Sequence, residues 1–100
     1  MILNWFNAVE AVSFAQEMVL DINGLFPPTS QKGKAIPKKV FEKKFEGLFI
    51  RVHAFATKHK LNLYKKAKLL NTIKWGLREA GHEDAFIDEV IALFAPLLNR

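Results

Sequence analysis

Apolar residues recur every three or four positions along most of the chain, which is the period of an α-helix with one buried side. The clearest segment begins at Pro37, whose ring is preset for a first helical turn, and ends near His59. The pattern predicts a long amphipathic helix over 37–59, and its apolar side is rich in aromatic rings. The positions that form this side are Phe41, Phe45, Leu48, Phe49, Val52, Phe55 and Ala56.

Three further segments show the same period. The first predicted helix covers 4–22 and is expected to end at Gly24, because glycine adopts the left-handed conformation of a helix stop at little cost. The third begins with Asn62 as N-cap and ends before Gly81. The fourth begins at 83–84, where acidic side chains suit the positive end of the helix dipole. Pro96 is expected to kink this helix or to end it.

The inward positions of these three helices follow from the same spacing. They are Trp5, Ala8, Val9, Val12, Ala15 and Val19 in the first, Leu63, Ala67, Leu70, Ile73 and Leu77 in the third, and Phe86, Val90, Leu93, Phe94 and Leu97 in the fourth. The sequence shows no strand pattern. We therefore predict a single all-α domain over 1–100 with a four-helix bundle-like fold.

Residues 24–36 form the long Pro/Gly-containing connection between the first two helices. Its two prolines and two glycines oppose a regular helix. We expect apolar residues to hold it against the body, namely Leu25, Phe26 and Ile36. Two interpretations stay open. The connection is either a strap between helices or a functional segment whose Phe26-Pro27-Pro28 stretch docks into an aromatic groove of a partner.

A second set of apolar residues follows the helix over 37–59 on the side away from the aromatic one. Val40, Gly47, Ile50 and Ala54 are spaced by seven, three and four residues, and lie roughly 180° to 260° around the helix from Phe41. The small residues at 47 and 54 allow another helix to approach closely. We predict that this side contacts a second copy of the chain in a homodimer. The alternative is that the first helix or the connection over 24–36 covers it.

Positive charge is concentrated in the middle of the chain. Residues 32–78 contain fourteen of the fifteen basic residues and only two acids, Glu42 and Glu46, whereas both ends of the chain are acidic. Like charges at this density need anions nearby. The anions come either from a partner or from the acidic first and fourth helices.

The third predicted helix carries a basic and aromatic ridge. Its members recur at spacings of four and three, which places them on one side of the helix. Lysine and arginine neutralise phosphates, asparagine hydrogen-bonds base edges, and tyrosine or tryptophan stacks on unpaired bases. Two interpretations stay open: contact with an anion or a nucleic acid, and a solvated or internally balanced surface. The residues concerned are Tyr64, Lys68, Asn71, Trp75 and Arg78, with Lys65 and Lys74 beside them.

The sequence gives little support to catalysis. There is no cysteine, and the two serines, Ser13 and Ser30, show no signature of activation. His53 and His59 lie on different sides of one predicted helix, no HExxH motif occurs, and there is no pair of Glu-x-x-His motifs from facing helices of the kind that di-metal four-helix proteins need. We predict no catalytic residue, no metal and no cofactor. A role as accessory subunit of an enzyme stays open.

The apolar N-terminal segment is interrupted by polar residues too often to span a membrane, and no basic residue of a signal peptide precedes Lys32. We predict a cytoplasmic protein without membrane contact, and the absence of cysteine agrees with that compartment. The predicted function is that of a small non-enzymatic binding or assembly protein. It acts as a homodimer through an apolar helix interface and a basic surface, with another protein or a nucleic acid as further partner. The alternative is a nucleic-acid-binding or regulatory protein that uses the basic ridge.

Overall fold

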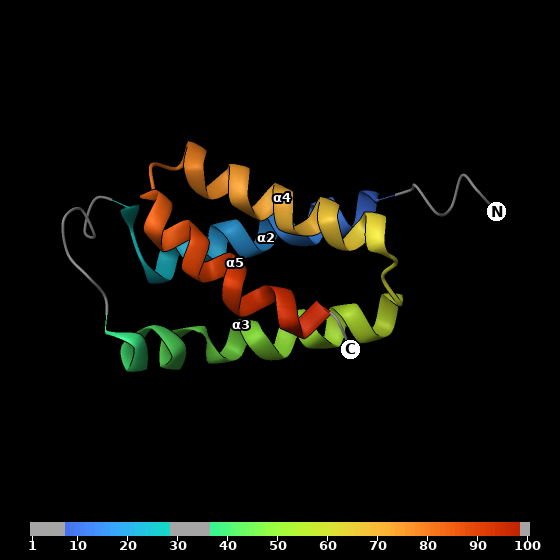
Figure 1. The fold of residues 1–100 in the computed structure, drawn as a ribbon, viewed down its shortest axis with the longest axis horizontal. Helices are drawn as coiled ribbons and strands as arrows, with labels where there is room; N and C mark the ends of the chain where they lie inside the picture. The colour runs from blue at the N-terminus through green and yellow to red at the C-terminus, as the bar shows by residue number, and fades with distance from the viewer. Residues whose placement is uncertain (1–7, 29–36, 99–100) are drawn as a thin grey trace.

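The computed structural model describes residues 8–28 and 37–98, with only the backbone of Lys38. Four helices contain nearly all of these residues (Figure 1). They are α2 (Val9–Leu25), α3 (Lys38–His59), α4 (Leu63–Glu79) and α5 (Asp84–Leu98). No strand occurs in these two ranges. The predicted all-α, four-helix bundle-like fold is confirmed.

The helix ends show the local chemistry that the sequence indicated. Asn62 Oδ1 accepts a hydrogen bond from Lys65 N at 2.8 Å, so Asn62 is the N-cap of α4 as predicted. At the end of α3, Lys60 takes the left-handed conformation with φ 47°, a role that glycine fills more often. Gly81 fills that role in the turn between α4 and α5, with φ 100°.

One predicted helix stop is wrong, and one of the two outcomes expected at Pro96 does not occur. Helix α2 continues through Gly24 to Leu25, where Phe26 N donates to Ile22 O at 2.8 Å. Burial of Phe26 in the core keeps this last turn in place, so the glycine does not end the helix. Helix α5 continues past Pro96 to Leu98, so the proline does not end it directly. Residues 4–7 of the predicted first helix and 29–36 of the predicted connection lie outside the described residues.

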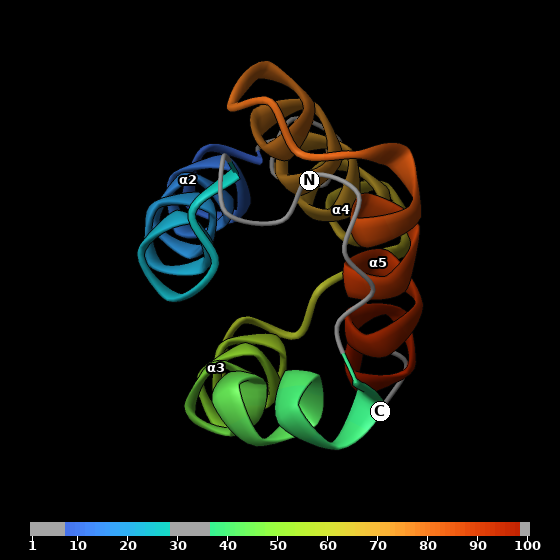
Figure 2. The same cartoon turned by 90° about the vertical axis from the view of Figure 1, so that its left-hand side faces the viewer.

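Helix α5 joins the other three helices into one body. Helix α2 packs along α4, and α5 packs against both α4 and α3 (Figure 2). Helix α3 runs along the opposite side of the molecule from α4 and approaches α2 less closely than α4 does. One side of α3 is therefore directed to the core, and the other is directed away from all three neighbours.

An aromatic cluster fills the space between α3, α5 and the end of α2. The ring of Phe26 lies 5.4 Å from those of Phe41 and Phe45, and these two stack on each other at 4.6 Å. From α5, Phe86 meets Phe41 edge-on at 5.5 Å, and Phe94 meets Phe45 edge-on at 5.9 Å. Such arrangements of rings stabilise a core beyond the burial of their area. The predicted aromatic side of α3 is confirmed.

The inward face of α4 is rotated relative to the predicted one. Leu63 is 79% exposed and Ala67 is exposed, whereas Leu69, which was not predicted to face inward, is fully buried. Leu70 is partly buried at the edge of the core. Apolar residues occupy both 69 and 70, so the period alone permits two faces. Packing against α2 selects the face with Leu69.

The same correction applies to α2. Val9 is 71% exposed, and Ala8 and Ala15 are buried as predicted. Met18 and Ile22 are fully buried, although neither was assigned to the inward face. The helix presents this face to α4, whose buried residues are Leu69, Ile73 and Leu77. Trp5 lies outside the described residues.

Candidate interaction surfaces

The outer stripe of α3, which consists of Val40, Gly47, Ile50 and Ala54, lies on the exposed side of the helix. Val40 is 43% exposed and Ile50 is 69% exposed. Apart from the adjoining residues and backbone of α3 itself, no atom of the described residues lies within 4 Å of a Cβ built on Gly47. Helix α2 therefore leaves the stripe open, which contradicts the alternative that the first helix covers it. The other alternative, coverage by the connection over 24–36, falls mostly on residues outside the described ones.

Charged side chains border the outer stripe. Lys39, Lys43 and Lys58 are exposed on this side of α3, and Glu46 is the nearest exposed acid along the helix. The arrangement combines a narrow apolar strip with positive charge, and Lys43, about 200° around the helix from Phe41, lies within the strip itself. Such a surface suits contact with an apolar helix and with negative charge around it.

The predicted ridge on α4 lies on the surface. Tyr64 is 37% exposed and Trp75 is 53% exposed, and Lys68, Asn71 and Arg78 are also exposed. Two of the flanking lysines that were predicted to help, Lys65 and Lys74, are partly buried. The spacing thus gathers the five ridge residues on one exposed side of α4.

Two cations lie against the ring of Trp75. The Arg78 guanidinium carbon is 5.1 Å from the ring centroid, and Lys74 Nζ is 5.9 Å from it. Arg78 also forms an ion pair with Asp84 at 3.2 Å. These contacts hold the indole in place while about half of it stays exposed. Arg78 already has a carboxylate partner, whereas Lys68 forms no ion pair with a described residue.

A groove lies between α2 and α4, and the sequence did not predict it. It consists of two adjoining hollows of about 600 and 420 Å³, and both are lined by Gln16 and Lys68. The larger hollow has Leu20 on its α2 wall and Trp75 on its α4 wall. The smaller hollow includes Val9, which like Leu20 is 71% exposed. Two of the large apolar residues that α2 leaves exposed therefore lie along this groove, whereas the exposed Leu25 lines neither hollow.

A glycine allows α2 and α4 to lie this close. A Cβ at Gly76 would come 2.8 Å from Val19 Cγ2, which is closer than real Cβ contacts. Gly76 and Val19 both line the larger hollow. The shape of the groove therefore depends on the absence of a side chain at Gly76.

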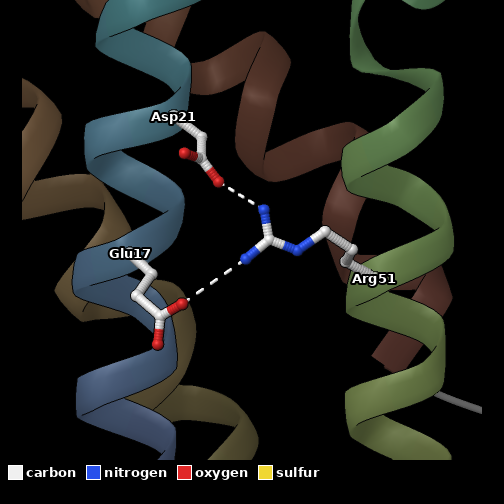
Figure 3. A network of polar contacts seen from close by, with 3 residues as sticks. All are labelled: Glu17, Asp21 and Arg51. Carbon is white, nitrogen blue, oxygen red and sulfur yellow. Dashed lines mark hydrogen bonds and ion pairs between the residues drawn. The ribbon is translucent and has the colours of Figure 1, made fainter.

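The acidic residues of α2 contact basic side chains of α3. The Arg51 guanidinium pairs with the carboxylate of Asp21 and lies 3.5 Å from Glu17 Oε1 (Figure 3). Nearer the start of α2, Glu10 Oε2 lies 3.3 Å from His59 Nδ1. All these partners are on α3, so these carboxylates do not serve the cations of α4. The pairs are exposed and each contributes little to stability.

No lysine side chain in the described part of the chain forms an ion pair. The salt bridges there use Arg51, His59 and Arg78. The sequence left open that carboxylates of the acidic helices neutralise the basic residues. In the described residues these carboxylates pair with arginines but not with lysines. The lysines concerned are Lys39, Lys43, Lys44, Lys58, Lys60, Lys65, Lys66, Lys68 and Lys74.

His82 is the buried polar side chain of the described residues and is 6% exposed. Its Nε2 lies 2.7 Å from Asn23 Oδ1, and its ring stacks on Phe86 at 4.5 Å. Its Nδ1 is buried without a hydrogen-bond partner. Burial lowers the pKa of His82, because the charged imidazolium loses hydration there. The contact joins the turn after α4 to the end of α2.

The docking stretch considered at the start of the long connection is not available to a partner in the described residues. Phe26 is 5% exposed and belongs to the aromatic cluster, so the Phe26-Pro27-Pro28 stretch cannot offer this ring to a partner as one interpretation required. Across 8–28 and 37–98, no three His, Asp or Glu side chains gather as a metal site would require. Within the same ranges, no helix is both long and apolar enough to cross a membrane.

The chain matches no protein-family model, no curated protein and no solved structure.

Proposed function

We propose that the chain is a small non-enzymatic binding or assembly protein that forms a homodimer through the outer stripe of α3. The supporting observation is that Ile50, 69% exposed, stands beside exposed Gly47 and Ala54 on a helix whose other side fills the aromatic core. A helix with apolar residues on two sides has one side left to contact another molecule. The further partner is another protein or a nucleic acid.

An antiparallel pairing of two α3 helices suits this stripe. With the two-fold axis between Gly47 and Ile50, Ile50 of one protomer lies over Gly47 of the partner subunit, and the same contact occurs a second time. The large residue fills the space that the small one leaves. Lys43 then extends its aliphatic stem over Ala54 of the partner subunit and keeps its ammonium in water.

The test is the molar mass in solution, measured by light scattering after size exclusion. We expect the unmodified chain to associate and Ile50→Asp to have a lower molar mass at the same concentration, because each new carboxylate would be buried against Gly47 of the partner subunit. His53→Asp introduces the same charge on an exposed position of α3 outside the stripe and should associate as the unmodified chain does. Circular dichroism shows whether each variant keeps its helices. A monomeric unmodified chain, or equal effects of the two variants, contradicts the proposal.

A second function is supported by the unpaired lysines. The chain would then be a nucleic-acid-binding or regulatory protein, and the ridge on α4 would be its contact surface. The exposed part of Trp75 would stack on an unpaired base, and Lys68 and Asn71 would contact phosphate and base edge. Such non-specific binding has a dissociation constant of roughly 10⁻⁴ to 10⁻⁶ M and weakens with salt.

Fluorescence anisotropy with a labelled single-stranded oligonucleotide tests this second function at about 50 and about 200 mM salt. We expect Lys68→Glu to weaken binding more than Lys39→Glu, which makes the same charge change on α3. Absence of binding at the lower salt concentration removes the nucleic acid as a ligand. Equal losses in the two variants assign the binding to overall charge rather than to the ridge.

A further inference from the structure

The α4 wall of the larger hollow is self-complementary in charge and size. Its members along the helix are Lys68, Asn71, Thr72, Trp75, Gly76 and Glu79. Reversing the direction of the helix about the midpoint of this set exchanges Lys68 with Glu79, and Thr72 with Trp75. A base therefore meets an acid at each end, and a large ring meets a small side chain in the middle. This pattern fits a second α4 that runs antiparallel to the first.

The two charged residues of this wall are available for such a contact. Lys68 and Glu79 are both exposed, and neither takes part in the ion pairs of the described residues. They are eleven positions apart, about 16 Å along the helix, so they cannot pair with each other in one protomer. The carboxylates of Glu17 and Asp21 are bound to Arg51 and do not serve Lys68.

We propose that a second copy of the chain docks into the groove between α2 and α4, with the two α4 helices antiparallel. Lys68 of one protomer pairs with Glu79 of the partner subunit, and two-fold symmetry repeats this pair. Trp75 lies over Thr72 of the partner subunit, near the partner subunit's Trp75 on the other side of the two-fold axis.

Apolar burial favours the same arrangement. Trp75 is 53% exposed, and Leu20 on the α2 wall is 71% exposed. Val9 continues the apolar strip into the smaller hollow. A docked helix removes part of this surface from water, which stabilises association in proportion to the apolar area covered.

The charge of the groove separates this partner from a nucleic acid. Lys68 and Glu79 carry opposite charges in one wall, so the larger hollow has no excess of positive charge from its own lining. A phosphate backbone along this wall would be attracted at Lys68 and repelled at Glu79. A second copy satisfies both residues at once.

This contact uses other helices than the outer stripe of α3 and does not depend on it. A chain that uses both surfaces forms assemblies larger than a dimer. The experiment is therefore made with the full chain carrying Ile50→Asp, which removes the contact between α3 helices. The association constant is measured by sedimentation over a range of protein concentrations.

The variants exchange the two charges. Lys68→Glu and Glu79→Lys each place like charges together at both ends of the paired helices, so we expect each to weaken association about tenfold or more. The double variant restores the opposite pairs and should restore association. An equimolar mixture of the two single variants should also associate, because each then meets the opposite charge in the other. Circular dichroism confirms that the helices are kept.

Three results overturn the proposal. One is a monomeric Ile50→Asp chain at every concentration. Another is a double variant and a mixture that remain as weak as the single variants. The third is that an oligonucleotide binds less tightly to Lys68→Glu and more tightly to Glu79→Lys, while neither variant changes self-association. If the α3 contact alone does not form, the charge-exchange variants still have the same effects on association through the groove. The two proposals can therefore be tested separately.

Discussion

His82 Nε2 lies 2.7 Å from Asn23 Oδ1, and this contact determines which ring nitrogen carries the proton. Because the amide oxygen accepts, Nε2 donates and the neutral ring has no proton on Nδ1. That nitrogen is buried without a partner, so protonating it would place a charge where no acceptor is available. The arrangement stabilises the neutral ring and links the end of α2 to the turn before α5.

Stability should therefore depend on pH through His82. Burial lowers the pKa of His82 in the folded chain, whereas the unfolded chain keeps the ordinary value near 6.5. The unfolded state thus binds more protons between these two pKa values, and stability falls as the pH drops below about 6.5. Urea unfolding at several pH values between about 5 and 8 measures this slope.

His82→Gln isolates the contribution, since its side-chain amide keeps a donor but does not titrate. We expect a smaller slope in this variant. His53→Gln removes an exposed histidine of α3 and should leave the slope as it is. If His82→Gln retains the full slope, the buried imidazole is not its source.

The inward face of α4 can be tested with two leucines. Leu69 is fully buried and Leu63 is 79% exposed, although the spacing favoured Leu63. We expect Leu69→Ala to lower the free energy of unfolding by about 2–5 kcal/mol. Leu63→Ala should change it by less than about 0.5 kcal/mol, as for most surface substitutions. Chemical denaturation measures the free energy of unfolding of both variants. A larger loss for Leu63→Ala than for Leu69→Ala would show that α4 buries the face that the spacing favoured.

Two helical glycines should respond in opposite directions to the same substitution. In the Ile50→Asp chain, where the contact between α3 helices is removed, Gly47→Ala adds a methyl group in open space and should stabilise the chain by about 0.5–1 kcal/mol through helix propensity. Gly76→Ala brings its Cβ to 2.8 Å from Val19 Cγ2, so α2 and α4 must separate or Val19 must shift. We expect a loss of about 1 kcal/mol or more. Thermal unfolding measures both, and a gain at both positions would show that the two helices do not approach as described.

The predictability of each helix from sequence follows from where its apolar residues stand. In α3, the phenylalanines at 41, 45 and 49 occupy one side, so a single face fits the period and the prediction is confirmed. In α4, Leu69 and Leu70 are adjacent, and the period cannot choose between them. The choice depends on α2, which is distant in sequence.

The candidate surfaces divide in the same way. Spacing within one helix placed Tyr64, Lys68 and Trp75 on a common exposed side of α4. The groove needs residues from α2 as well, and no pattern in one segment indicates that Leu20 lies across from Trp75. The pairing of Arg51 with Asp21 is likewise a product of the fold, since thirty positions separate the two residues.

The outer stripe of α3 offers the most direct test of the account, because its residues have no other explanation within the described fold. The measurement is the molar mass of the unmodified chain in solution, followed from low to high concentration beside Ile50→Asp. We expect the unmodified chain to associate, and Ile50→Asp, still helical, to have a lower molar mass at the same concentration because the contact through α3 is lost. An unmodified chain that remains a monomer at every concentration would contradict it.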